Sequence, residues 1–360
     1  MKVNQVMPLV GREEAANVVD AIDNKWLSEG PWCEKFLAEL QALSGANYAV
    51  FAPNGTLGLY LAIVALDLPP NSEILVPSFT FFGSASSIVF AGHTPVFVDV
   101  SMSDYTMDAA DLRLKITEKT AAIMGVHIYG QAARVDEIAQ IAHEYDLKFI
   151  EDAAQAIGVT FEKQHAGTLG DIGVISFFAD KTITTGEGAV IFCKDETLWQ
   201  RLRLLRNQGR PNSGTFVHEA LGMNFRITDM QAAVGYTQLI RLPGIQRQRA
   251  ASYDIYERQL KDCAHVNFME IDPRSSFTPF RFPFTSEKKV SIQRLLEEKG
   301  VQTRSFFYPM HLQPPLQKYR GADCRCPNSE ILYEQGLALP IHSGVSTEMI
   351  EHICGIIRSA

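Results

Sequence analysis

Short apolar runs alternate with helical patterns through the first two thirds of the chain. The runs are rich in Val, Ile, Phe and Ala, and the segments between them have helical length and spacing. The predicted strands are residues 48–53, 73–77, 94–100, 121–127, 147–151, 172–178 and 188–193, and the predicted helices are 56–66, 80–91 and 135–145. Nearly continuous apolar strands separated by helices indicate a mostly parallel sheet covered on both faces.

The pattern changes near residue 240. A long charged helix is predicted over residues 246–263, followed by an apolar and aromatic run at 276–284 and a helix at 289–300. We therefore expect a large α/β domain over residues 1–240, including an N-terminal arm, and a smaller α+β domain over residues 241–360. No low-complexity linker separates them, so the two domains should pack closely.

Composition narrows the possible partners. The chain has 41 acidic and 33 basic side chains and a net charge of −8, which disfavours nucleic acid. No apolar run approaches the length of about 20 residues that a membrane span needs, so we expect a cytoplasmic protein. The six cysteines and nine histidines are dispersed. They predict reduced thiols and no metal site.

Candidate chemistry lies where predicted strands end, because ligands of parallel α/β sheets collect at the carboxyl ends of the strands. Asn54, Gly55 and Thr56 follow the first strand and precede a helix. A glycine at a helix start suits a phosphate. An ordinary turn with a helix N-cap explains the same residues.

Two further polar positions follow strands. Asp152 ends the fifth strand and precedes Gln155, either as a helix-capping or core carboxylate or as the partner of a cation such as a protonated pyridine nitrogen. Lys181 lies in a polar loop, five residues after Ser176 and between two strands. A lysine in such a loop is usually a solvated surface group. If it is buried at the ligand edge, its pKa falls and its free amine can form a Schiff base.

Together these positions indicate a single ligand that has a phosphate, a pyridinium ring and an aldehyde. Pyridoxal phosphate has all three groups. The sequence then resembles the DegT/StrS-type sugar aminotransferases over most of its length. The motifs that carry the resemblance are NGT (54–56), PSFTF (77–81), HIYGQ (127–131), EDAAQAIG (151–158), GDIGVISFFADKTITTGEGA (170–189), LRNQGR (205–210), MNFRITDMQAAVG (223–235) and FYPMH (307–311). The resemblance implies fold type I, with a mostly parallel seven-stranded sheet, a smaller C-terminal α+β domain and PLP-dependent amino transfer.

The resemblance also implies roles around the cofactor ring. Lys181 would hold the cofactor and move a proton between the substrate carbon and the cofactor. Asp152 would pair with the pyridine nitrogen, Gln155 would approach the ring hydroxyl, and Phe81 would stack on the ring face. The cluster of Phe79, Phe81 and Phe82 at a predicted turn agrees with such stacking.

The cofactor phosphate has its own set of implied residues. Gly55, Thr56 and Ser176 would bind it from this chain. Asn224 would complete the site from a partner subunit, which implies a homodimer with composite active sites. From the residue alone, Asn224 is equally a polar position ahead of a helix.

The substrates follow only from the resemblance. The closest likeness is to enzymes that use glutamate to aminate C4 of a GDP-linked 4-keto-6-deoxymannose, for surface polysaccharide synthesis. Gln155 departs from the glutamate that those enzymes tend to carry, and another keto sugar or a small phosphorylated ketone is the alternative. Arg226, Tyr308 and His311 are the substrate-side candidates. A salt bridge explains Arg226 and a domain interface explains Tyr308 and His311 equally well.

Three other functions were weighed. The dehydratase branch of the family replaces the cofactor lysine with histidine, so Lys181 argues against it. A cofactor-binding regulator would carry an added DNA-binding or membrane segment, and none is apparent. A nucleotide-cofactor enzyme would need a complete glycine-rich phosphate loop after a strand, and none occurs.

Overall fold

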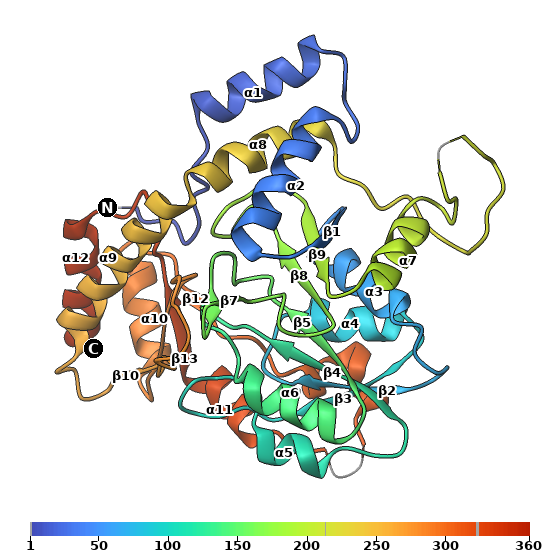
Figure 1. The fold of residues 1–360 in the computed structure, drawn as a ribbon. Helices are drawn as coiled ribbons and strands as arrows, with labels where there is room; N and C mark the ends of the chain where they lie inside the picture. The colour runs from blue at the N-terminus through green and yellow to red at the C-terminus, as the bar shows by residue number, and fades with distance from the viewer. Residues whose placement is uncertain (1, 213, 322–323) are drawn as a thin grey trace.

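A computed structural model describes residues 2–212, 214–321 and 324–360. Its larger sheet has seven strands in the order β1-β9-β8-β5-β4-β2-β3, with helices on both faces (Figure 1). Five of these strands, β1, β2, β5, β8 and β9, are buried at every position after the first, and β3 and β4 each have one half-buried position after the first, so their apolar runs match their surroundings. The strands are β1 (Tyr48–Ala52), β2 (Glu73–Pro77), β3 (Thr94–Val98), β4 (Thr120–Val126), β5 (Lys148–Asp152), β8 (Ile172–Ser176) and β9 (Ala189–Cys193).

All seven predicted strands are therefore present within a few residues of their expected bounds. β9 runs antiparallel to both of its neighbours, β1 and β8, and the remaining pairs are parallel. The fold-class prediction of a mostly parallel seven-stranded sheet is confirmed. The helices of this part are α1 (Arg12–Asp23), α2 (Pro31–Ser44), α3 (Gly55–Ala65), α4 (Phe82–Phe90), α5 (Ala109–Leu114), α6 (Val135–Glu144), α7 (Glu196–Arg206) and α8 (Asp229–Ile240).

Two buried clusters cover the two faces of this sheet. The first packs α2, α6 and α8 against one face, and the second packs α3 and α4 against the other. α3 is apolar on all sides, as expected for a helix buried between the sheet and its neighbours. Because α3 and α4 begin within a few residues of the ends of β1 and β2, their N-termini lie at the carboxyl edge of the sheet.

The C-terminal part has its own four-stranded antiparallel sheet, in the order β10-β11-β13-β12, with its own buried cluster. The domain boundary at residue 240 stays a prediction. A two-stranded pair, β6 (Thr160–Phe161) with β7 (Gln164–His165), lies outside both sheets. The C-terminal elements are α9 (Leu242–Leu260), β10 (Asn267–Phe268), β11 (Phe282–Thr285), α10 (Lys289–Glu298), β12 (Arg304–Ser305), η1 (Met310–Leu312), η2 (Pro314–Tyr319), α11 (Pro327–Gln335), β13 (Gly336–Leu339) and α12 (Thr347–Arg358).

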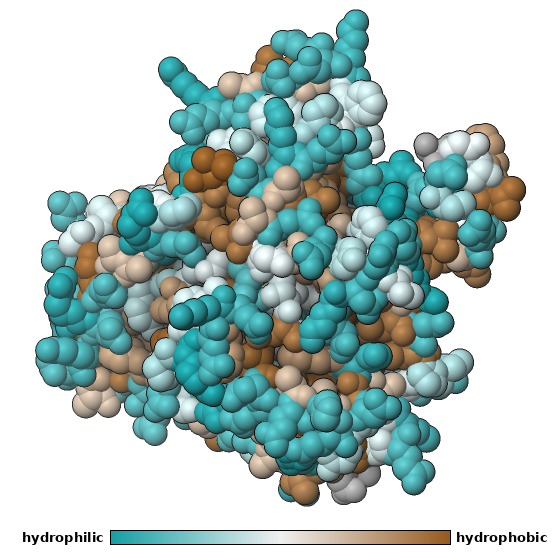
Figure 2. Space-filling model, viewed as in Figure 1, coloured by the Kyte–Doolittle hydropathy of each residue, from teal (hydrophilic) through white to brown (hydrophobic). Residues whose placement is uncertain are grey.

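The connection between α7 and α8 projects from the body of the molecule (Figure 1). Hydrophobic residues gather on this projection (Figure 2). We call residues 214–223 the outer loop; its exposed apolar side chains are Phe216, Val217, Leu221 and Met223, with exposed fractions of 89%, 67%, 99% and 51%. Apolar side chains held this far from the core indicate a contact surface. Within the described residues, no helix is long and apolar enough to cross a membrane.

Candidate active site

A cavity of about 910 Å³ lies at the carboxyl edge of the larger sheet. The turns after β1, β2, β5 and β8 form its floor, and residues 280–281 and 304–313 form its outer wall. Of the residues predicted from the sequence, those that line it are Gly55, Thr56, Phe81, Asp152, Gln155, Ser176, Lys181 and Tyr308. Segments up to 250 positions apart in the sequence therefore meet at the predicted edge of the sheet.

The start of α3 forms an anion cradle with the end of β8. The Asn54 side chain accepts a hydrogen bond from the Leu57 N–H (3.0 Å) and caps the helix. A Cβ added to Gly55 would lie 3.0 Å from Ser176 Cβ and 3.2 Å from its Oγ, so only glycine lets the helix start approach β8 this closely. The first N–H groups of a helix have no partner within it, so this helix start can bind an anion.

Asp152 is fixed at the end of β5. Its side chain is buried, the Ser84 hydroxyl donates to Oδ2 (2.6 Å), and the Ala154 N–H donates to Oδ1 (3.1 Å). A carboxylate held at both oxygens has a fixed direction and can serve a cationic ligand in the cavity. Gln155, close by, accepts the Tyr129 N–H at its Oε1 (2.9 Å). Its NH₂ group remains as the donor for a ligand.

Lys181 is partly buried beside this floor and lines the cavity. Burial lowers the pKa of its amine, and Arg281 lowers it further, while Asp180 and Asp152 act in the opposite direction. Its Nζ lies 5.0 Å from the centre of the Phe280 ring. A buried amine with a lowered pKa supplies more of the neutral, nucleophilic form at neutral pH.

Threonines hold the lysine loop in place. The Thr184 hydroxyl donates to the Phe177 carbonyl (3.0 Å) and accepts the Gly186 N–H (2.8 Å). The Thr185 hydroxyl donates to the Glu187 carbonyl (2.6 Å). Gly186 has φ +80°, a conformation that favours glycine. Sequence reasoning gave these hydroxyls no role, because bonds from a side chain to its own loop leave no periodic pattern.

The outer wall adds residues that the sequence did not single out. Arg281 is buried and pairs with Asp180 at 2.7 Å. Phe307 lies nearly parallel to Tyr129, with ring centres 6.1 Å apart, and edge-on to Phe81 at 6.4 Å. Phe81 itself is 60% exposed. Arg281 and Phe307 come from segments outside the predicted strand-to-helix turns, so only the folded structure brings them to the site.

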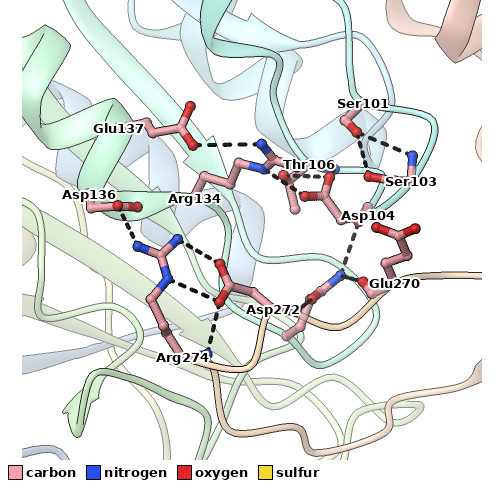
Figure 3. Close-up of polar contacts among 11 residues, drawn as sticks. Ser101, Ser103, Asp104, Thr106, Arg134, Asp136, Glu137, Glu270, Asp272 and Arg274 are labelled. Atoms are coloured by element: carbon pink, nitrogen blue, oxygen red, sulfur yellow. Dashed lines mark hydrogen bonds and ion pairs between the residues drawn. The ribbon is translucent and has the colours of Figure 1, made fainter.

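An ion-pair network connects the start of α6 with the connection that follows β3 and with the connection that precedes β11 (Figure 3). Arg134 pairs with Asp104 (2.7 Å), and Arg274 pairs with both Asp136 and Asp272 (2.7 Å each). Arg134 joins the start of α6 to the connection between β3 and α5, and the Arg274–Asp136 pair joins α6 to the connection that precedes β11.

Backbone bonds continue this junction into the cavity wall. The Phe280 N–H donates to the Tyr129 carbonyl (3.1 Å), and the Thr278 N–H donates to the Gly130 carbonyl (2.9 Å). Gly130 has φ +97°, and a Cβ there would lie 1.9 Å from the Thr278 oxygen. The network therefore positions the ring of Phe280 next to Lys181.

Three predicted site residues do not line the cavity. Both ring nitrogens of His311 have partners, Ser78 at 2.7 Å and Glu330 at 3.1 Å, and the side chain is fully buried. It therefore occupies an interface position, which was the alternative interpretation. Asn224 and Arg226 lie on the connection that leads to α8, where Arg226 donates to the Asn207 side chain. Tyr308 does line the cavity, and its ring packs edge-on against Tyr333 at 5.0 Å.

Comparison with known proteins gives this site its context. The model of the DegT/DnrJ/EryC1/StrS aminotransferase family matches residues 8–358. The chain belongs to this family. It is 33% identical to a GDP-perosamine synthase of Escherichia coli O157:H7 and 34% identical to one of Caulobacter vibrioides, in both cases over 98% of this chain and 96% of the relative. A crystal structure of the aminotransferase TlmJ from Streptoalloteichus hindustanus superposes with a TM-score of 0.94 at 28% identity, covering 100% of this chain and 98% of that one.

The protein is therefore a PLP-dependent sugar aminotransferase, which confirms the prediction from its sequence. The cavity fits the cofactor. It has a cradle that a Cβ at Gly55 would fill, a buried carboxylate held by Ser84, and a buried amine with a lowered pKa. These are partners for a phosphate, a pyridinium nitrogen and an aldehyde respectively.

Proposed function

We propose that this enzyme transfers the amino group of L-glutamate to C4 of GDP-4-keto-6-deoxymannose, producing GDP-perosamine for a surface polysaccharide. The observation that carries this proposal is the 33–34% identity to two GDP-perosamine synthases over nearly the whole chain. Amino transfer to a sugar is the activity of the family, and the acceptor is the proposed part.

The cofactor residues have defined roles in this proposal. Bound PLP supplies an aldehyde that takes up an amine and a ring that accepts an electron pair. The Lys181 amine, whose pKa is lowered by burial, would hold the cofactor and would then move a proton to and from the reacting substrate carbon. Asp152 binds the pyridinium nitrogen and keeps it protonated, and Gln155 donates its NH₂ group to the ring hydroxyl.

The remaining predicted residues bind and orient. Gly55, Thr56 and Ser176 hold the phosphate in the cradle at the start of α3. Phe81, whose ring is largely exposed in the cavity, covers one face of the cofactor ring. On the acceptor side Tyr308 contacts the sugar nucleotide. His311 supports this wall from behind through Ser78.

We further propose a homodimer with composite sites. Asn224 and Arg226 are absent from the lining of this chain's own cavity, and the adjoining outer loop exposes four large apolar side chains. A two-fold dimer would bury these side chains. It would let the partner's loop bring Asn224 to the cofactor phosphate and Arg226 to an anionic group of a substrate.

An acceptor panel tests the substrate assignment. The purified protein is incubated with glutamate and, separately, with GDP-, UDP- and dTDP-linked 4-keto sugars and with dihydroxyacetone phosphate, and products are read by mass spectrometry. The expected result is an amino sugar from GDP-4-keto-6-deoxymannose, with a kcat/KM that exceeds that for the other acceptors. Turnover confined to a different ketone would contradict the acceptor and leave the aminotransferase assignment intact.

A further inference from the structure

A second, much smaller cavity lies next to Lys181. Its volume is about 30 Å³, and it shares Asp180, Lys181, Phe280 and Arg281 with the large cavity. The lysine loop therefore separates two spaces. The large one lies on the predicted substrate side, and the small one is lined on one side by the N-terminal segment. Its other wall residues are Gln5, Val6, Met7, Pro8, Leu9, Ala179, Thr182, Thr184, Gln238, Ile245, Gln248, Arg249, Ile341, His342 and Ser343.

The Thr182 hydroxyl is the unexplained group in this small cavity. The residue is 5% exposed, and its Oγ1 has no hydrogen-bond partner among the described residues. A buried hydroxyl left without a partner costs about 1–3 kcal/mol. Native structures avoid that cost with a protein partner or an ordered water. No role has been assigned to Thr182 above, and it does not line the substrate cavity.

The N-terminal segment closes the cavity through contacts with distant parts of the chain. The Gln5 N–H donates to Gln302 Oε1 (3.1 Å), and His342 Nε2 bonds to the Asn4 carbonyl (2.9 Å). With its amide turned so that both ends are satisfied, Gln5 also accepts a hydrogen bond from Arg281 Nη1 at 3.0 Å. The segment is thus fixed across the back of the lysine loop.

The space is large enough to admit water, and its wall carries polar side chains. A buried water needs two to four polar partners. Thr182 supplies one partner, and Gln5, Gln248 and Asp180 are further polar side chains of the wall. Arg249 and Arg281 on the same wall oppose a metal cation.

We propose that this cavity holds one ordered water bound by the Thr182 hydroxyl, and that Thr182 acts through it as a positioning residue for Lys181. The water joins the lysine loop to the N-terminal segment and gives the partly buried amine of Lys181, which also lines this cavity, a polar neighbour. It therefore favours the protonated form of the lysine nitrogen and limits how far burial depresses its pKa. This inference rests on the proposed role of Lys181.

A crystal structure of the protein at about 1.5 Å resolution tests the first part directly, since ordered waters that make three hydrogen bonds are visible there. The expected result is one water within hydrogen-bond distance of Thr182 Oγ1, present with and without cofactor. An empty cavity, or an anion such as chloride in it, would overturn the proposal.

Substitution tests the second part. In cofactor-loaded Thr182→Val, the pH midpoint of the absorption change that reports the lysine nitrogen should move down by roughly half a unit, the size expected of one hydrogen bond. Thr182→Ser keeps the hydroxyl and should restore the midpoint. Thr237→Val is the matched control, because its hydroxyl is also buried and bonded, to Asn17 and Ala233, but it lines neither cavity.

The outcomes separate the two proposals. If Thr182→Val and Thr237→Val give the same midpoint as the unaltered protein, Thr182 has no positioning role and this inference fails. If the unaltered protein shows no lysine-dependent absorption at all, the role of Lys181 fails instead. Hydrogen exchange of residues 5–9 in the cofactor-free protein gives a second readout, and it should be faster in Thr182→Val than in Thr182→Ser.

Discussion

At the scale of single residues, the chemistry depends on how Lys181 is buried. Its partly buried amine lies near Phe280, Asp180 and Arg281, and the nearest carboxylates only partly offset the effect of burial on its pKa. The same lysine in an exposed loop would be protonated at neutral pH and inert. Keeping this reactive amine in the site therefore lowers the stability of the folded protein.

This cost predicts a pH dependence of stability in the cofactor-free protein. The folded pKa of Lys181 is lowered from 10.5, so between the folded pKa and 10.5 the unfolded chain binds more protons than the folded one. Stability from this group should therefore rise with pH through that window and be lost as pH falls through it. Urea unfolding of the unaltered protein and of Lys181→Met measures it.

The variant should be the more stable of the two at neutral pH. The difference should shrink as the pH rises through 10.5, because well above that pH the lysine is neutral in both states. A difference in the free energy of unfolding that stays constant with pH would show that the pKa of the Lys181 amine is not lowered in the folded protein. Lys288→Met serves as the control, because Lys288 is an exposed lysine of the C-terminal part.

At the scale of elements, the site depends on where strands end and helices begin. The start of α3 meets the end of β8 because Gly55 has no side chain. In Gly55→Ala the added Cβ would press on Ser176 and narrow the cradle. We expect cofactor affinity to fall by about 10-fold or more, from an overpacking cost on the order of 1–3 kcal/mol.

Equilibrium titration of the cofactor-free protein with PLP, followed by absorbance, measures this loss. Gly355→Ala is the matched control, since a Cβ at Gly355 in α12 meets nothing within 4 Å. It should leave the affinity unchanged and stabilise the helix by about 0.5–1 kcal/mol. Equal PLP affinity in the Gly55→Ala and Gly355→Ala variants would contradict the proposal that the start of α3 binds the cofactor phosphate.

Much of this element-level picture was predictable from the sequence. Apolar runs mark the strands because buried parallel strands are apolar on both faces, and polar residues directly after them mark the ligand edge. The reversed direction of β9 was not predictable, because strand direction leaves no trace in the apolar pattern. Neither were Ser84, Arg281 and Phe307, or the buried place of His311, since these depend on contacts between distant segments.

At the scale of the whole molecule, the account requires two chains. One chain supplies Lys181 and the phosphate cradle, while Asn224 lies outside its own cavity beside the exposed outer loop. Mixing inactive Lys181→Ala subunits with impaired Asn224→Ala subunits then produces hybrids in which one site carries both changes and the other carries neither.

Such a mixture should regain roughly a quarter of the full activity, because about half of the dimers are hybrids and each has one intact site. Activity assays after denaturation and refolding together, alongside each variant alone, give the comparison. Activity of the mixture no greater than the mean of its components would contradict composite sites. Sedimentation should show a dimer in every sample.

The central claim is that the Lys181 amine carries the cofactor and the amino transfer. The most direct measurement is borohydride reduction of the cofactor-loaded protein, which makes the lysine–cofactor link permanent, followed by peptide mass mapping. We predict a single modified peptide with the pyridoxyl group on Lys181, and its disappearance when glutamate is added before reduction. Modification of a different lysine, or none in protein that still transfers amino groups, would contradict the account.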